Sequence, residues 1–323
     1  MLPIDMEPPA PQKVEEMLME IMPARNKEEY RSVSDTDFAY QVPGVARFRC
    51  NAFRDRKGPG GVFRLVPLNI VTADELGLPP AIRGFCKLNK GLVLVTGPTG
   101  SGKSTTLCAM MDLINKTRTE HIITVEDPIE FVHENRLCMI NQREVHENTT
   151  SFARALRAAL REDPDIVMVG EMRDLETTHI AIETSETGHL VFGTLHTTTA
   201  ASTVERLVDQ FPADRQEQIR SMLSVNLKGV ISQALLKRKD GKGRVAALEI
   251  LLVTPAVSNL IRERKTFQIP SIMQVNMKLG MVCLNDALLR LVMDNKVDAG
   301  EALEKAVDKE DMKAKLRVAG LHA

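Results

Sequence analysis

Aromatic residues are scarce in this chain: they make up 4% of its 323 residues, with no tryptophan and two tyrosines. Few side chains are therefore available for stacking nucleic-acid bases, which argues against a single-strand nucleic-acid channel. An excess of one charge is also missing, since 42 Lys and Arg stand against 43 Asp and Glu. Without a global basic field, we expect no nucleic-acid partner.

Paired cysteines and long apolar runs are absent as well. The five cysteines lie far apart in the sequence and none forms a Cys-x-x-Cys pair, so neither a zinc ribbon nor a disulfide framework is indicated. No apolar stretch approaches membrane-spanning length, and the N-terminus lacks a signal-peptide pattern. We therefore expect a cytoplasmic protein without a transmembrane segment.

A glycine-rich segment is the most informative feature that the chain does have. Residues 97–104 read Gly-Pro-Thr-Gly-Ser-Gly-Lys-Ser, the phosphate-binding pattern G-x-x-x-x-G-K-[ST]. The segment follows the apolar run 92–95 and precedes a helix predicted over 104–114, which is the context that this motif requires. The predicted nucleotide-binding residues are Gly97, Pro98, Thr99, Gly100, Ser101, Gly102, Lys103, Ser104 and Thr105.

The chemistry of this segment suits a nucleoside triphosphate. Its glycines let successive backbone N–H groups point inward at an anion, and the following helix adds its positive end. Lys103 supplies a point charge for the β- and γ-phosphates, and the hydroxyl of Ser104 is placed for Mg²⁺. We therefore expect ATP and Mg²⁺ as cofactors.

Alternating strands and helices follow this segment and predict an α/β fold. Continuous apolar runs at 122–125, 166–169 and 190–195 are typical of a parallel sheet that is buried on both faces. We expect a long helix over 213–236, then a strand over 245–252, and helices from Pro255 to the end. Ahead of the sheet, a helix over 12–22 and a hairpin formed by 46–53 and 62–66 indicate a small α+β domain.

Acidic residues follow two of the predicted parallel strands. Glu126 ends one strand and Glu171 follows another, and the carboxyl ends of parallel strands carry the ligand in such sheets. Glu126 is our candidate for activating water, and Glu171 for holding the metal, directly or through its water. The alternative for each is a solvated acid at a strand end, and which of the two is the general base stays open.

A histidine and several arginines are further candidates. His196 lies at the same strand edge and is either a structural hydrogen-bonding residue or a contact to the γ-phosphate. The hairpin carries five arginines, which form either a solvated face or a source of arginine fingers for a neighbouring subunit. They are Arg47, Arg49, Arg54, Arg56 and Arg64.

Three further segments resemble the motifs of the secretion ATPase superfamily, in the order of that superfamily. Residues 124–130 resemble its Asp box, 163–174 its Walker B motif and 187–197 its His box. Within the superfamily the chain is most similar to the retraction ATPases of type IV pili, over residues 36–310. The segments that carry this similarity are 46–51, 75–80, 238–246, 255–263 and 269–274.

The resemblance implies a homohexameric ATPase that powers pilus retraction and twitching motility. It implies a PAS-like N-terminal domain over 1–84, a RecA-like motor over 85–253 and a helical region over 254–323. Arg49 and Arg64 would match the arginines that act on the next subunit, and His196, with His189 less surely, would lie near the phosphates. The expected partner is the inner-membrane platform protein at the pilus base, where the cytoplasmic ring would be peripheral to the membrane.

Two departures from this family leave more than one function open. The N-terminal domain is shorter than is usual in the family, and Val257 and Ser258 stand where an Ile-Arg pair is common. The second departure leaves room for an accessory retraction motor. A pilus assembly or secretion ATPase, a regulatory nucleotide-binding ring and a RecA-like nucleic-acid motor are further candidate functions.

Overall fold

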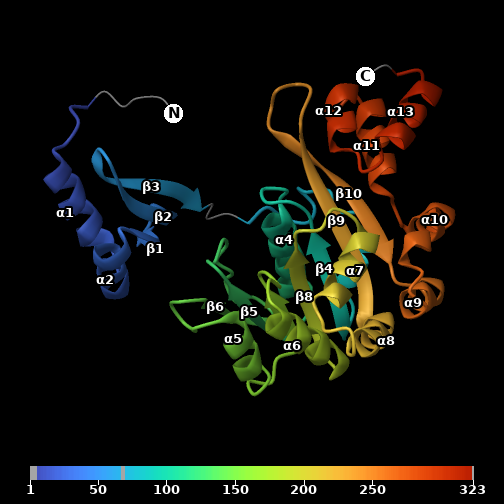
Figure 1. Ribbon diagram of the computed structural model, residues 1–323, viewed down its shortest axis with the longest axis horizontal. Helices are drawn as coiled ribbons and strands as arrows, with labels where there is room; N and C mark the ends of the chain where they lie inside the picture. Colours follow the sequence, from blue (N-terminus) through green and yellow to red (C-terminus); the bar gives the residue numbers. More distant parts are fainter. Residues whose placement is uncertain (1–5, 67–69, 322–323) are drawn as a thin grey trace. The chain divides into compact units, whose positions relative to one another are not determined.

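The chain forms two compact units, seen in a computed structural model that describes residues 6–66 and 70–321 (Figure 1). The first unit comprises residues 1–69 with 130–132, and the second comprises 70–129 with 133–323. The outer ends of the predicted first and last domains, 1–5 and 322–323, lie outside the described residues.

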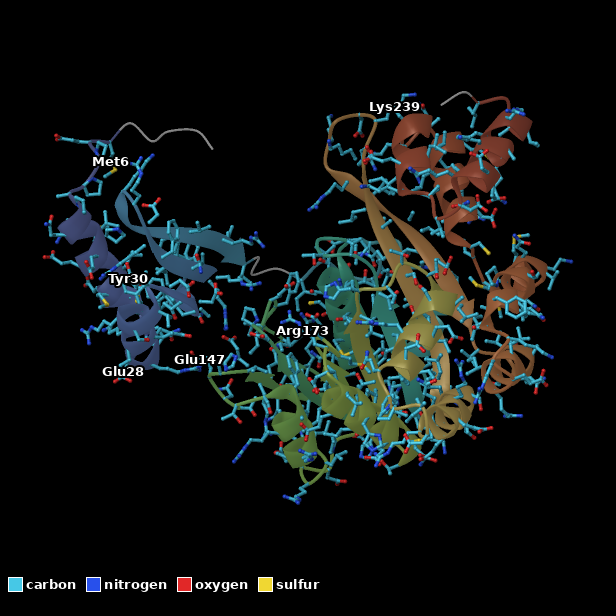
Figure 2. The ribbon with its side chains drawn as sticks, viewed as in Figure 1. Met6, Glu28, Tyr30, Glu147, Arg173 and Lys239 are labelled. Atoms are coloured by element: carbon cyan, nitrogen blue, oxygen red, sulfur yellow. The ribbon has the colours of Figure 1, made fainter. Side chains whose placement is uncertain are left out.

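The first unit is an antiparallel sheet of order β1-β2-β3 with two helices. The hairpin predicted from the sequence is confirmed as β2 and β3, and the predicted first helix is confirmed as α1. Phe38 and Cys50 are cross-strand partners on the face that buries Leu18 and Tyr30 of the helices. Tyr30 is labelled in Figure 2. The elements are α1 (Pro11–Ile21), α2 (Ala24–Val33), β1 (Asp35–Val42), β2 (Ala46–Asp55) and β3 (Gly58–Val66).

The second unit is built on a seven-stranded sheet of order β10-β9-β4-β8-β7-β5-β6. Neighbouring strands from β9 to β6 are parallel, and β10 is antiparallel to β9. Every residue of β4 and β8 is buried, which confirms the prediction from the continuous apolar runs. The strands are β4 (Gly91–Thr96), β5 (His121–Glu126), β6 (Met139–Glu144), β7 (Ile166–Val169), β8 (Leu190–Leu195), β9 (Leu227–Lys237) and β10 (Arg244–Leu252).

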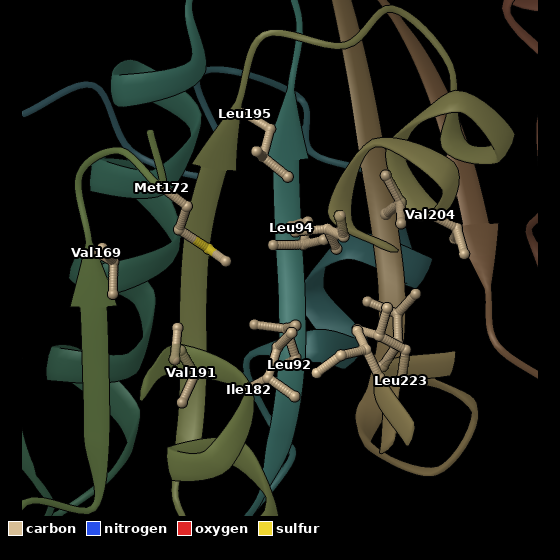
Figure 3. Close-up of a cluster of buried hydrophobic side chains, with 14 of the residues drawn as sticks. Leu92, Leu94, Val169, Met172, Ile182, Val191, Leu195, Val204 and Leu223 are labelled. Atoms are coloured by element: carbon tan, nitrogen blue, oxygen red, sulfur yellow. The ribbon is translucent and has the colours of Figure 1, made fainter. Parts of the chain in front are cut away.

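Helices cover both faces of this sheet, as expected for an α/β fold. Leu92 and Leu94 of β4 pack with residues of α6, α7 and α8 on one face (Figure 3). Val93 and Val95 alternate onto the other face, where α3 and α4 lie. The helices of these two layers are α3 (Pro80–Phe85), α4 (Lys103–Thr117), α5 (Phe152–Ala159), α6 (Leu175–Glu186), α7 (Ala200–Asp209) and α8 (Gln216–Asn226).

The long helix predicted over 213–236 is wrong in its second half. Helix α8 ends at Asn226, and the chain continues as strand β9 between β4 and β10. The leucine-rich sequence there suits a helix, but burial between two strands overrides that preference. Gly229 makes room for this packing, because a Cβ on it would lie 2.0 Å from the ring of Phe85.

The remainder of the chain is helical after Thr254, as predicted. Among the described residues, none of the helices combines the length and the apolar character that crossing a membrane requires.

Buried Glu249 of β10 accepts hydrogen bonds from the backbone N–H groups of Ala200 at 2.7 Å and Leu284 at 3.0 Å, so it links α7 to α11. The elements are α9 (Pro255–Arg262), η1 (Thr266–Gln268), α10 (Ile269–Val275), η2 (Met277–Leu279), α11 (Leu284–Met293), α12 (Ala299–Lys305) and α13 (Lys309–Val318).

Candidate nucleotide site

The predicted phosphate-binding loop, residues 97–102, joins the end of β4 to the start of α4. Gly97, Gly100 and Gly102 have positive φ angles of 144°, 78° and 89°, a conformation that costs glycine little and other residues more. Gly97 also lies against β9, because a Cβ on it would be 2.3 Å from the backbone oxygen of Gln233. The loop is therefore curled and closely packed, with the positive end of a 15-residue helix behind it.

The side chains of Lys103 and Ser104 lie at the end of the loop, on the first turn of α4. The ammonium of Lys103 donates to the backbone oxygens of Gly97 at 2.7 Å and Pro98 at 3.2 Å, so it is held over the loop. Ser104 is the next residue of α4 and is partly exposed. Both side chains therefore lie at the start of the helix, beside the curled backbone.

The strand order brings the predicted acids and His196 to the same edge of the sheet as the loop. Strand β8 lies between β4 and β7, and β5 follows β7. Glu126 is the last residue of β5, Glu171 follows β7 by two residues, and His196 immediately follows β8. Since these strands run parallel to β4, all three residues lie at the carboxyl edge that carries Lys103, as the sequence predicted.

Glu171 is held between two basic side chains. Its Oε1 lies 2.6 Å from Nε2 of His196, and its Oε2 lies 2.6 Å from Nη2 of Arg173, which is labelled in Figure 2. Burial raises the pKa of Glu171, but the hydrogen bonds from Arg173 and His196 outweigh it, and the net pKa is lowered. The carboxylate is therefore ionised at neutral pH. The sequence pattern did not reveal the pairing with Arg173, which depends on how the loop turns after β7.

Glu126 is buried and accepts hydrogen bonds from two neutral groups. It is 8% exposed, and its Oε1 accepts from Oγ1 of Thr124 at 2.6 Å and from Nε2 of Gln142 at 3.0 Å. Thr124 precedes it on β5, and Gln142 comes from the neighbouring strand β6. These bonds orient the carboxylate, and sequence reasoning missed the donor Gln142 because β6 was not predicted as a strand.

Arg49 and Arg64 lie opposite each other in the first unit. They are cross-strand partners in the register of β2 and β3, so their side chains leave the same face of that sheet, and both are exposed. Like charges in this position repel each other. Within the part of the chain that the structure describes, neither arginine has an ion pair. This face is therefore suited to an anion.

The expectation that His189 lies near the phosphates is wrong. His189 precedes β8, and its backbone oxygen accepts from the N–H of Gly91 at the start of β4. It therefore lies at the amino edge of the sheet, one strand length of roughly 20 Å from the loop. His189 and His196 flank the same strand, and only the second reaches the carboxyl edge.

The donor groups at the loop fit a magnesium ion that arrives with a nucleotide. Over residues 6–66 and 70–321, no group of three or more His, Cys, Asp or Glu side chains could hold a metal by itself. A magnesium ion commonly takes one or two protein oxygens, with phosphate oxygens and water as its other ligands. The hydroxyl of Ser104 and the ionised carboxylate of Glu171 are oxygen donors of this kind.

Comparisons with known proteins agree with this geometry. The family model described as "Type II/IV secretion system protein" matches residues 12–302. PilT of Pseudomonas aeruginosa, a type IV pilus retractation ATPase, is 52% identical over 303 residues, which cover 94% of this chain and 88% of PilT. A twitching motility protein of Neisseria gonorrhoeae is 50% identical, over 93% of this chain and 80% of that protein. PilU of P. aeruginosa, a type IV pilus ATPase, is 37% identical, over 98% of this chain and 83% of PilU.

Solved structures show the same likeness. The pilus retraction motor PilT with bound ADP matches with a TM-score of 0.87 and 46% identity, over 93% of this chain and 85% of that chain. The ATPase DotB of Legionella pneumophila matches with a TM-score of 0.78 and 26% identity, over 99% and 86%. The resemblance stated from the sequence motifs and the predicted α/β motor fold are both confirmed.

Proposed function

Since the chain belongs to the type II/IV secretion system protein family, we propose that it is the ATP-hydrolysing motor that powers retraction of a type IV pilus. The chain is an ATP hydrolase, and two observations carry the rest of the proposal. It is 52% identical to the retraction ATPase PilT over 94% of its length, and its phosphate-binding loop has the backbone that phosphate binding needs.

Nucleotide binding rests on the loop and the start of α4. The N–H groups of residues 99, 100 and 102–105 and the positive end of the helix would bind the phosphates, and Lys103 would leave the carbonyls of Gly97 and Pro98 to contact the terminal phosphates. Ser104 and Glu171 would hold Mg²⁺, which neutralises charge on the phosphate oxygens when it is bound. Because Arg173 and His196 contact its two oxygens, Glu171 would hold the metal through a water molecule.

Glu126 and Glu171 have different roles in hydrolysis. The pKa of Glu171 is lowered by its two basic partners against the effect of burial, which makes it a weak proton acceptor. Thr124 and Gln142 donate to Glu126 and orient its carboxylate at the carboxyl end of β5. This position, together with the lowered pKa of Glu171, supports Glu126 as the general base that takes a proton from the attacking water. His196, bonded to Glu171, would respond to the γ-phosphate.

The exposed basic face of the first unit supports a ring of subunits with arginine fingers. The facing exposed pair Arg49 and Arg64 supports a role in neutralising the phosphates of a neighbouring subunit's nucleotide. We therefore propose a homohexamer with a PAS-like first domain, a RecA-like motor and a helical C-terminal region. The ring would act at the inner membrane, on the platform protein of the pilus base.

An accessory retraction motor is the second candidate, because of the segment 255–263. Val257 is fully buried and replaces isoleucine by a similar side chain, but Ser258 lies in a cavity of about 440 Å³ together with Asn259 and Arg262. A serine there lacks the charge that is common in the family. The identity of 52% with PilT against 37% with PilU supports the principal motor.

Deletion of the gene tests the proposal. We expect cells without it to carry excess surface pili and to lose twitching motility, and complementation with the intact gene to restore both. Complementation with Lys103→Ala is the matched control, since it leaves the rest of the chain in place. Loss of surface pili on deletion would point instead to an assembly motor, and unchanged twitching with normal pili would contradict retraction.

A further inference from the structure

The phosphate-binding loop is held from a strand that lies far away in the sequence. Gln233 of β9 is buried, with 4% of its surface exposed. Its Nε2 donates to the backbone oxygen of Ser101 at 2.6 Å, and its Oε1 accepts from Oγ1 of Thr106 at 2.8 Å. One side chain therefore joins the loop and the first turns of α4 to the sheet.

Gln233 also leaves no room for a side chain at either end of the loop. A Cβ on Gly97 would lie 2.3 Å from the backbone oxygen of Gln233, and a Cβ on Gly102 would lie 2.7 Å from its Nε2. The first and last glycines of the loop therefore both lie against Gln233. This contact explains why glycine is needed at these two positions for packing as well as for the positive φ angle.

The hydrogen bond from Gln233 to the carbonyl of Ser101 also fixes the direction in which the N–H of Gly102 points. The carbonyl of Ser101 and the N–H of Gly102 belong to one planar trans peptide, so they point in opposite directions. While Gln233 holds the carbonyl toward β9, the N–H of Gly102 is directed away from β9. This is the kind of N–H group with which such loops bind phosphate.

We propose that Gln233 is a positioning residue for ATP hydrolysis, which keeps the phosphate-binding loop in its binding conformation in the absence of nucleotide. It touches no substrate itself and acts through Ser101 and Gly102. A loop that is already curled loses less conformational entropy when nucleotide binds. The effect of Gln233 is therefore on nucleotide affinity and on KM, more than on kcat.

The test compares four variants of the full-length chain by titration calorimetry with ADP and by steady-state ATP hydrolysis. Gln233→Leu removes both hydrogen bonds, and Gln233→Glu keeps the shape but sets a carboxylate oxygen against the Ser101 carbonyl. Thr106→Val removes only the second bond. Gln210→Leu is the matched control, since Gln210 also accepts from a threonine hydroxyl, that of Thr178 at 2.8 Å, but it does so at the far end of α7.

We expect the ADP dissociation constant and the KM for ATP to rise about tenfold in both Gln233 variants, the size of one or two ordinary hydrogen bonds. We expect the ADP dissociation constant and the KM for ATP to rise about threefold in Thr106→Val and to stay unchanged in Gln210→Leu. If Gln233→Leu does not fold, Gln233→Glu and Thr106→Val decide. A folded Gln233 variant with an ADP dissociation constant within twofold of wild type would overturn the proposal, and so would an equal loss of affinity in Gln210→Leu.

Discussion

Replacing Glu126 by glutamine separates nucleotide binding from hydrolysis in this enzyme. An amide keeps an acceptor oxygen for Oγ1 of Thr124 and Nε2 of Gln142, which now donate to the carboxylate at 2.6 and 3.0 Å. Each bond loses its charge assistance, which amounts to about 1 kcal/mol. We therefore expect the free energy of unfolding to fall by about 2 kcal/mol at most, and the ADP affinity to stay within about threefold of wild type.

The loss of turnover is expected to be far larger. An amide cannot accept the proton of the attacking water, and general-base catalysis contributes about 10²–10⁴-fold to the rate. We expect kcat for ATP to fall by that factor, measured by phosphate release at saturating ATP, with ADP affinity measured by calorimetry on the same preparation.

A matched control lies on the next strand. Glu144 is the register partner of Glu126 in the parallel pair of β5 and β6, is 5% exposed and accepts from the N–H of Ile129 at 3.1 Å. We expect Glu144→Gln to change kcat by less than about threefold, because its carboxylate has a structural role. If Glu126→Gln keeps more than a tenth of the wild-type kcat, or if Glu144→Gln loses as much, the reasoning about the general base is refuted.

Four further outcomes are expected. Lys103→Ala loses nucleotide binding by calorimetry, because several charge-assisted contacts of about 1.5–3 kcal/mol each depend on it; unchanged ADP affinity would refute the phosphate-loop assignment. Arg49→Ala lowers ATP turnover in mixed wild-type and mutant rings by more than dilution explains, whereas a linear dependence on the mutant fraction would exclude an action on the neighbouring subunit. Glu249→Ala lowers the free energy of unfolding in urea by about 2–4 kcal/mol, because two buried N–H groups lose their acceptor; a loss under about 0.5 kcal/mol would contradict that bond pattern. The pKa of Glu171 is lower in the folded than in the unfolded state, so its ionised form stabilises the fold at neutral pH, and this stability is lost as the pH falls through the folded pKa. We expect His196→Ala to weaken this loss in thermal melts between pH 3 and 7. An unchanged pH profile would show that His196 does not contribute.

Much of the site could be predicted because its motifs are local. The glycines at 97, 100 and 102 allow the positive φ angles that the loop has there, and apolar runs buried on both faces are typical of parallel strands. Once the strands were predicted to be parallel, Glu126, Glu171 and His196 had to share the edge that carries Lys103. The prediction for His189 was wrong because the motif contains a histidine on each side of β8 and does not show which of the two lies at the edge with the phosphate-binding loop.

The partners of these residues could not be predicted, because they come from pairings between distant segments. Arg173 reaches Glu171 through a loop whose course no periodicity describes, and Gln142 reaches Glu126 from a strand that the pattern missed. Residues 227–236 read as helix, and only burial between β4 and β10 makes them a strand.

The sequence alone therefore determined the chemical groups and the parallel strands β4, β5, β7 and β8 that carry them, because glycine geometry and hydrophobic periodicity act over a few neighbouring residues. The tertiary structure alone decided how those groups are held. Gln233 supports the loop from 132 residues away in the chain, and Glu249 joins two helices that follow different strands. Such contacts depend on which strands lie side by side, a choice made by the burial of the whole sheet rather than by any local segment.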